Sequence, residues 1–327
     1  MDFWKDKNVL VTGANGFIGS WVTEALVKNK ANVTALIRDK IPNSYLILSE
    51  TIKDINIVYG SLTDINIIKR ALNEYEIDTV FHLAAQAIVG AANRSPLSTF
   101  ESNIKGTWNL LEACREHELI ERIVVASSDK TYGDQKKLPY TEDSPLLGLY
   151  PYDASKACAD ILTRTYYNTY QLPVAITRLA NTYGGGDLNF SRIIPDTIRA
   201  ILKKQSPIIR SDGTPVRDYM YVKDAASAYL ILAENLHKKE VIGQAFNFGT
   251  NTPINVINLV KKILKIANSA LKPAVKGKGK TKGEIDKQYL DSSKAKRLLN
   301  WQPSCILDRG LKETFEWYKL NLNKIEK

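Results

Sequence analysis

The stretch VLVTGANGFIG, residues 9–19, decides the fold class of this chain. An apolar, β-branched run leads into a G-x-x-G-x-x-G turn made by Gly13, Gly16 and Gly19, and a helical pattern follows. Glycines let the backbone turn tightly and approach a pyrophosphate, and the free N–H groups at a helix start favour negative charge. At the first strand-to-helix junction this spacing predicts a dinucleotide site, with a purely structural turn as the alternative.

Short apolar runs alternate with helical patterns along the first half of the chain. Continuous apolar strands separated by helices are typical of a parallel sheet covered on both faces, so we expect an α/β fold with a doubly wound parallel (Rossmann) sheet. The predicted strands are 9–11, 33–37, 57–59, 79–83, 123–126 and 174–177, and the predicted helices include 64–75, 95–117 and 152–170. The less regular order after Leu179 predicts a smaller C-terminal α/β substrate lobe. We expect an NAD(P)-binding domain at 1–178, to which 220–249 return, and a substrate-binding lobe at 179–219 and 250–327.

Composition limits the classes of protein that this chain can be. Of its 327 residues 44% are hydrophobic and 24% charged, as in ordinary globular proteins. No apolar run reaches the length of a membrane span and the start lacks a secretory apolar stretch, so we expect a cytoplasmic protein without a membrane partner. Three widely spaced cysteines predict neither disulfides nor a metal site. The net charge of +10 is compatible with several anionic partners, and a loop with Lys276, Lys278, Lys280 and Lys282 is either solvated or attracts substrate phosphate.

A tyrosine and a lysine four residues apart lie on one helix face, where the ammonium can lower the phenol pKa from about 10. Three such pairs occur, at 132/136, 152/156 and 219/223. Only Tyr152 and Lys156 start a long predicted helix and follow a serine-rich strand end that carries Ser128. We therefore expect Tyr152 to be the catalytic base, Ser128 to bind the reacting hydroxyl, and Lys156 to hold the ribose and tune Tyr152.

With these motifs the chain resembles the extended short-chain dehydrogenase/reductases, the NAD-dependent epimerase/dehydratase family. Besides the glycine turn and the Tyr-Lys pair, the resemblance rests on the segments 81–86, 103–113, 217–224, 291–295 and 301–303. The sequence Ser128-Asp129-Lys130 is similar to sugar-nucleotide 4,6-dehydratases, and its Asp-Lys pair resembles the CDP-glucose and UDP-N-acetylglucosamine types. Further segments, such as 184–187 and 192–196, look most like the CDP-glucose type, whereas residues 213–219 look more like the epimerases and general dehydratases. The resemblance leaves the nucleotide open.

The resemblance implies a lyase (EC 4.2.1-like) that converts an NDP-hexose into the 4-keto-6-deoxy sugar without net redox change, as in polysaccharide biosynthesis. After oxidation at carbon 4 the ketone acidifies carbon 5 and water leaves, with Asp129 as the acid and Lys130 as helper or base. The alternative, an NDP-sugar 4-epimerase (EC 5.1.3-like), has no use for this pair, which would then be structural. A non-catalytic regulator or nucleic-acid-associated protein is a third hypothesis, and the retained Ser-Tyr-Lys set argues against it.

Further residues match positions that hold cofactor or substrate in the family. NAD is the implied cofactor, and Arg38, followed by Asp39, keeps NADP open. The implied partners are a nucleotide-diphosphate sugar and a second copy of the chain, paired through the helices near Ser95 and Tyr152; we expect no nucleic acid and no metal. The expected cofactor-binding residues are Gly13, Gly16, Phe17, Ile18, Gly19, Arg38, Ser61, Leu62, Ala84, Ala85, Tyr152 and Lys156. The expected substrate-binding residues are Gln86, Asn103, Asn181, Arg192 and Arg217, the arginines because guanidinium groups suit a diphosphate.

Overall fold

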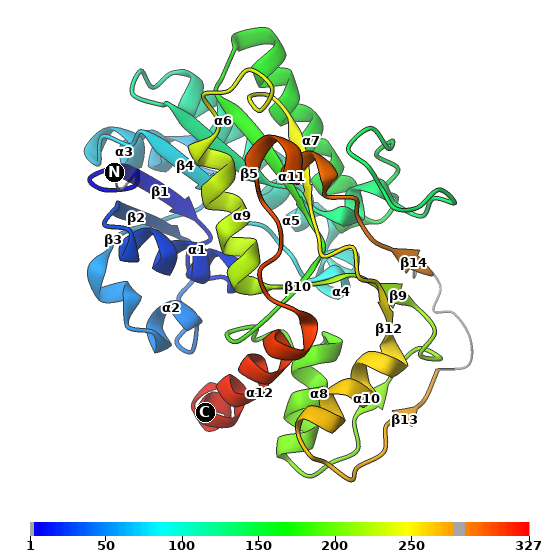
Figure 1. Cartoon of the computed structure of the whole chain (residues 1–327). Helices are drawn as coiled ribbons and strands as arrows, with labels where there is room; N and C mark the ends of the chain where they lie inside the picture. Colours follow the sequence, from blue (N-terminus) through cyan, green and yellow to red (C-terminus); the bar gives the residue numbers. More distant parts are fainter. Residues whose placement is uncertain (1–2, 278–284, 327) are drawn as a thin grey trace.

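A seven-stranded parallel sheet forms the centre of the molecule in the computed structural model, which describes residues 3–277 and 285–326 (Figure 1). The strand order is β11-β6-β5-β4-β1-β2-β3. This confirms the predicted α/β class and the doubly wound parallel sheet. The strands are β1 (Asn8–Thr12), β2 (Asn32–Ile37), β3 (Asn56–Tyr59), β4 (Thr79–His82), β5 (Arg122–Ala126), β6 (Val174–Leu179) and β11 (Ala245–Phe248).

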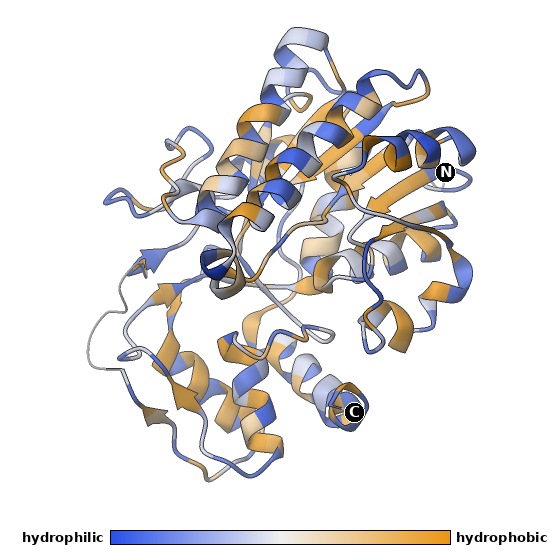
Figure 2. Ribbon diagram, turned by 180° about the vertical axis from the view of Figure 1, so that it is seen from behind, coloured by the Kyte–Doolittle hydropathy of each residue, from blue (hydrophilic) through white to orange (hydrophobic). Residues whose placement is uncertain are grey.

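Helices cover both faces of this sheet, which explains why its strands are apolar at consecutive positions. Val9 and Val11 face one hydrophobic cluster and Leu10 faces the other, and all three are fully buried. Helices α1 (Phe17–Lys28), α2 (Tyr45–Leu48) and α9 (Val222–Glu234) contribute to the first cluster. The second lies under α3 (Ile65–Glu74), α6 (Gly106–Arg115) and α7 (Pro151–Tyr170). Figure 2 shows the apolar strands between helices whose outer faces are hydrophilic.

The predicted helix at 95–117 is built from three consecutive pieces. Helix α5 (Pro96–Phe100) passes into a π-helical turn, η2 (Glu101–Lys105), and then into α6. One extra residue in a helical turn shifts the side chains on the turn relative to an unbroken α-helix, and such turns are frequent at functional sites. Here the π-turn carries Asn103, and α4 (Val89–Arg94) precedes the three pieces.

A buried ion pair fixes α7 against the sheet. Arg178 on β6 is 1% exposed, and its Nε and Nη2 atoms donate to the two carboxylate oxygens of Asp160 on α7 at 2.8 and 2.9 Å. Its Nη1 donates to the Tyr132 hydroxyl at 2.8 Å and to the Glu142 carbonyl at 3.1 Å. Tyr132 belongs to the short 3-10 helix η3 (Asp129–Tyr132), which follows β5. Arg178 therefore connects β6, α7 and the segment after β5 at one point.

The later segments form a smaller lobe below the carboxyl ends of the strands (Figure 1). Helices α8 (Ile193–Leu202), α10 (Val256–Ile266) and α12 (Leu307–Ile325) pack against one another there. Its strands are β7 (Asn181–Tyr183), β8 (Ile208–Ile209), β9 (Val216–Arg217), β10 (Tyr219–Tyr221), β12 (Ile254–Asn255), β13 (Ala274–Val275) and β14 (Lys287–Gln288). Helix α11 (Ser293–Leu299) returns to the large sheet and contacts β11. The domain boundaries given above remain a prediction.

Lys278, Lys280 and Lys282 of the predicted basic loop lie outside the described residues. In the described ranges, no helix combines the length and the apolar character that crossing a membrane requires. Cys114, Cys158 and Cys305 are free thiols.

Replacing Asp160 by asparagine should destabilise the protein by about 3–5 kcal/mol, because the charge of Arg178 would stay buried without its counterion. The measurement is urea unfolding at one fixed protein concentration. The matched control is Glu74→Gln, which removes the exposed ion pair between Arg70 and Glu74 and should cost at most about 1 kcal/mol. Equal losses in both variants would contradict the structural role of the Arg178–Asp160 pair.

Candidate active site

A cavity of about 930 Å³ lies at the carboxyl ends of the central strands, between the sheet and the smaller lobe. Ligands of open α/β sheets bind at this edge, and the volume lies in the upper range for small-molecule sites. The turn after β1, the residues after β3, β4 and β5, the start of α7 and several segments of the smaller lobe line it.

The glycine turn fits a close-approaching phosphate group. Gly13 has a positive φ of 73°, and a side-chain carbon there would lie 2.8 Å from the Cα atom of Ala84. A side-chain carbon on Gly19 would lie 2.0 Å from the carbonyl oxygen of Gly13. Glycine at position 13 therefore lets the turn lie close to the backbone of Ala84, and glycine at position 19 lets the start of α1 pack against the turn. The first turn of α1 contains no acidic residue, so its N–H groups and dipole face the cavity without competition from a carboxylate.

All twelve residues that the sequence predicts for cofactor binding line this cavity. Ser61 and Leu62 follow β3, and the carbonyl of Leu62 is held by the Asn109 amide at 2.8 Å. Arg38 and Asp39 lie after β2, where the Arg38 Nε atom donates to the Asp39 carboxylate at 2.6 Å. Both side chains are exposed. A ribose-accepting carboxylate and a phosphate-binding guanidinium are thus present side by side, and this arrangement alone does not choose between NAD and NADP.

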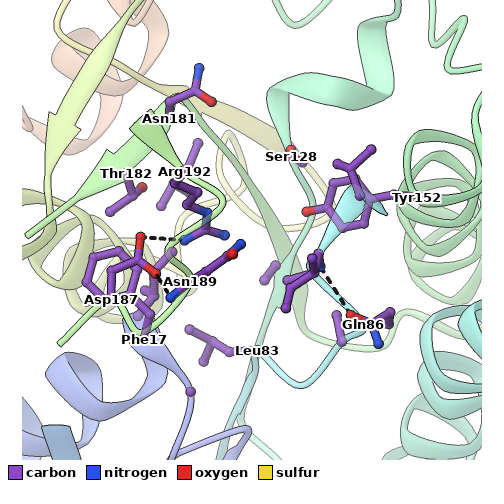
Figure 3. Close-up of a pocket in the computed structure, with 18 of the residues that line it drawn as sticks. Phe17, Leu83, Gln86, Ser128, Tyr152, Asn181, Thr182, Asp187, Asn189 and Arg192 are labelled. Atoms are coloured by element: carbon purple, nitrogen blue, oxygen red, sulfur yellow. Dashed lines mark hydrogen bonds and ion pairs between the residues drawn. The ribbon is translucent and has the colours of Figure 1, made fainter. Parts of the chain in front are cut away.

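Tyr152 and Lys156 stand on one face of α7, next to Ser128 at the end of β5. Figure 3 shows Tyr152 and Ser128 side by side, with the tyrosine hydroxyl directed into the cavity. Burial raises the pKa of Tyr152 to about 12, and a hydrogen bond with Ser128 and the charge of Arg192 act in the opposite direction. The Lys156 ammonium donates to the Ala126 carbonyl at 2.6 Å, and burial lowers its pKa to about 8. The geometry thus brings these three expected catalytic side chains together.

Asp129 and Lys130 lie in the first turn of η3, whose N-cap is Ser128. The Ser128 hydroxyl donates to the Asp129 carboxylate at 3.2 Å and accepts from the Lys130 backbone N–H at 3.2 Å. Burial raises the pKa of Asp129, and the nearby Lys130 ammonium partly offsets this shift. A buried carboxyl with a raised pKa keeps its proton at a higher pH than an exposed one, as a general acid requires. Both residues line the cavity.

Two arginines from the smaller lobe face the other side of the cavity. Arg192, the N-cap residue of α8, donates from Nη1 to the Asp187 carboxylate at 3.0 Å. Arg217 on β9 is 8% exposed, and its Nη1 donates to the Val216 carbonyl at 2.9 Å and the Asp286 carbonyl at 3.3 Å. The Asn181 Nδ2 atom is buried and finds no hydrogen-bond partner among the described residues. These donors form a surface that suits a diphosphate and its sugar.

Asn103, expected to bind substrate, is not among the residues that line the cavity. Its side-chain oxygen accepts from the Gln86 N–H at 2.7 Å, and its amide donates to the Gln86 carbonyl at 3.2 Å and the Ser155 hydroxyl at 2.9 Å. The π-turn aims Asn103 at the backbone of the segment after β4. Gln86 itself lines the cavity, so Asn103 holds a lining residue in place.

Two residues that the sequence did not single out take part in the site. Asp187 is 2% exposed and is held from several sides: it binds Arg192, its carboxylate accepts from the Asn189 N–H at 3.1 Å, and its carbonyl accepts from the Tyr318 hydroxyl at 2.5 Å. Figure 3 shows it opposite Tyr152. Gln288 on β14 is fully buried and contacts both Asp129 and Lys130. Asp187 could have been noted in the sequence, because it lies only five residues before the expected arginine Arg192. Gln288 could not, because it lies 158 residues from its partner Lys130.

Known proteins resemble the chain over nearly its whole length. The family model described as GDP-mannose 4,6 dehydratase matches residues 10–314. A trifunctional UDP-glucose 4,6-dehydratase/3,5-epimerase/reductase of Arabidopsis thaliana is 32% identical over 325 residues, which are 97% of this chain and 48% of that protein. This chain therefore spans about half the length of that relative. The CDP-glucose 4,6-dehydratase of Salmonella typhimurium is 29% identical, over 97% of this chain and 92% of the relative.

Solved structures with the same architecture include both dehydratases and epimerases. The dTDP-glucose 4,6-dehydratase of Bacillus anthracis, in complex with NAD, has a TM-score of 0.86 and 27% identity over 97% of this chain and 98% of its own. The UDP-glucose 4-epimerase of Thermotoga maritima, with UDP-glucose, has a TM-score of 0.87 and 29% identity over 96% and 99%. The family match, together with the cavity and the glycine turn described above, shows that the chain belongs to the GDP-mannose 4,6 dehydratase family of extended short-chain dehydrogenase/reductases.

Proposed function

We propose that this protein is a nucleotide-sugar 4,6-dehydratase, which converts an NDP-hexose into the NDP-4-keto-6-deoxyhexose. The observation that carries the proposal is the buried Asp129 and half-buried Lys130 directly after Ser128, in the same cavity as Tyr152 and Lys156. Oxidation at carbon 4 needs only Ser128, Tyr152 and Lys156. Loss of water needs an additional acid and base, and Asp129 and Lys130 supply them. The named dehydratase relatives support the same activity.

NAD is the proposed cofactor; when bound, it accepts a hydride from carbon 4 of the sugar and returns one to carbon 6. The glycine turn, the residues after β2, β3 and β4, and Lys156 would hold it. The complex of the similar dTDP-glucose 4,6-dehydratase with NAD supports this assignment. Arg38 next to Asp39 is the feature that would permit NADP.

The protein's own residues divide the reaction between them. The Tyr152 phenolate, oriented by Ser128 and favoured by the Lys156 ammonium, takes the proton of the 4-hydroxyl and becomes the neutral phenol. The 4-ketone acidifies carbon 5, whose proton goes to Lys130 in its neutral amine form, while Asp129 gives its proton to the departing 6-hydroxyl. Lys130 would return a proton to carbon 5 when carbon 6 is reduced. Arg192 and Arg217 would bind the diphosphate, Gln86 and Asn181 would contact the sugar, and Asn103 would hold Gln86.

An NDP-sugar 4-epimerase is the second candidate, because the similar structures include a UDP-glucose 4-epimerase. That reaction would use Ser128, Tyr152 and Lys156 in the same way and would leave Asp129 and Lys130 without a chemical role. The two activities differ in product mass, since dehydration removes one water and epimerisation removes nothing.

We also propose that the active protein is a homodimer, as the family resemblance implies. The outward faces of α5, α6 and α7 carry Leu97, Trp108 and Ile161, which are 71%, 42% and 51% exposed. These helices pack side by side on one face of the sheet. Burying such side chains against a second copy would remove apolar area from water.

The substitution Asp129→Asn should abolish loss of water or slow it at least ~100-fold, because an amide cannot deliver the proton that the 6-hydroxyl needs. The assay is mass spectrometry of the products from CDP-glucose, UDP-glucose, dTDP-glucose, UDP-N-acetylglucosamine and GDP-mannose. The control is Asp134→Asn, an exposed carboxylate on the loop that follows η3. It should leave the rate unchanged.

Either outcome of this assay is informative. Loss of water from one substrate by the wild type would identify the nucleotide. A wild-type product of unchanged mass but altered sugar stereochemistry would instead favour the epimerase, and Asp129 would then be dispensable.

The substitution Ile161→Asp should convert the proposed dimer into a monomer, because it places a charge in the apolar interface. Multi-angle light scattering at micromolar concentration measures this. The control is Leu320→Asp on α12, where an equally apolar side chain is 75% exposed on a different element. A wild-type protein with the mass of one chain would contradict the dimer.

A further inference from the structure

The side chain of Gln288, which lies outside the cavity lining, joins the Asp129–Lys130 segment to the smaller lobe. Its Oε1 atom accepts a hydrogen bond from the Lys130 ammonium, and its Nε2 atom donates to the Asp129 carbonyl at 2.7 Å. An acceptor must face the ammonium and a donor must face the carbonyl, so the two partners fix the orientation of the amide. The side chain is fully buried, which excludes water as a substitute.

The charged groups around Lys130 show why a neutral hydrogen-bond partner matters there. The ammonium interacts electrostatically with two buried carboxyl groups, Asp129 and Asp153. A free lysine side chain would move toward these carboxylates and form an ion pair, because opposite charges attract strongly at low dielectric. Such a pair would occupy both the acid and the base of the elimination. The hydrogen bond from Lys130 to the neutral amide of Gln288 competes with such a pair without adding a third negative charge.

The position of Gln288 also relates this contact to substrate binding. Strand β14 runs parallel to β9, with Gln288 in register with Arg217. Two residues earlier on the same segment, the Asp286 carbonyl accepts from the Arg217 guanidinium at 3.3 Å. The carbonyl of Tyr289, the residue after Gln288, accepts a hydrogen bond from the Tyr140 N–H at 3.0 Å, which anchors the segment to the loop after η3. One short strand therefore supports the proposed diphosphate-binding Arg217 and the proposed elimination residue Lys130.

From this geometry we infer that Gln288 is a positioning residue for the loss of water: it holds Lys130 at carbon 5 and acts on the elimination, not on the preceding oxidation. The inference rests on the proposed dehydratase activity. It requires no contact between Gln288 and the sugar. The side-chain hydrogen bonds of Gln288 go to Lys130 and to the Asp129 carbonyl, whereas oxidation at carbon 4 depends on Ser128, Tyr152 and Lys156.

The test is Gln288→Met, which keeps the length of the side chain and removes both hydrogen bonds. Water loss should slow roughly 10- to 100-fold, since displacement of a catalytic group by about 1 Å has effects of this size. The KM should stay within about twofold, and reduced cofactor, followed by absorbance at 340 nm, should accumulate on the enzyme because oxidation outruns elimination. A purely structural defect would slow both steps and leave no such accumulation.

A double-mutant cycle tests whether Gln288 acts through Lys130. In Lys130→Met the further change Gln288→Met should alter the rate of water loss by less than about twofold, because the group it positions is already absent. Gln288→Glu replaces the neutral amide by a third negative charge that would pair with Lys130 and keep it protonated, so it should slow water loss at least as much as Gln288→Met. If the Gln288→Met protein does not fold, Gln288→Glu takes its place in these measurements. The matched control is Gln244→Met, which removes an exposed Gln–Lys hydrogen bond to Lys294 and should change neither step.

The outcomes separate the inference from the function on which it rests. A wild type that dehydrates its substrate, with Gln288→Met equally fast or with additive effects in the cycle, overturns the role of Gln288 alone. A wild type that never changes product mass overturns the dehydratase proposal and this role together.

Discussion

The ion pair between Arg178 and Asp160 is the contact on which the geometry of the site depends. A single buried guanidinium binds α7 through Asp160 and η3 through the Tyr132 hydroxyl, while its own strand lies in the central sheet. Helix α7 carries Tyr152 and Lys156, and η3 carries Asp129 and Lys130. The relative position of the two groups is therefore set by one side chain that is itself remote from the cavity. Burying two charges costs desolvation free energy. The two parallel hydrogen bonds of the pair allow only one relative orientation of the arginine and the carboxylate, which fixes the position of α7.

Much of the fold followed from local sequence patterns. Strands buried on both faces are apolar at consecutive positions, as in Val9, Leu10 and Val11, so the parallel sheet was predictable without tertiary information. The glycine turn was equally predictable, because Gly13 and Gly19 occupy positions where a side-chain carbon would collide with the backbone. The predicted cofactor residues are local to the strand ends of such a sheet, and they line the cavity. Their individual roles remain predictions.

The parts that sequence reasoning missed depend on contacts between distant segments. The family resemblance implied Asn103 as a substrate-binding residue, and in the structure its amide, on the π-turn, contacts the backbone of Gln86. A one-residue change in helical winding leaves no clear mark on composition or periodicity. Gln288 stands on a two-residue strand, too short to carry a pattern, and meets Lys130 only after both lobes have formed. Such contacts become visible only in three dimensions.

The path of the chain between the two lobes has a consequence for protein engineering. The chain enters the smaller lobe after β6, returns to the sheet for α9 and β11, leaves again for β12 and α10, comes back with α11, and ends in the smaller lobe at α12. The smaller lobe is thus no contiguous cassette. Exchanging the smaller lobe with that of a relative would require at least three separate grafts, two of them with a junction at each end and the third, α12, with one junction. Single substitutions in the cavity wall are the more direct way to alter substrate preference.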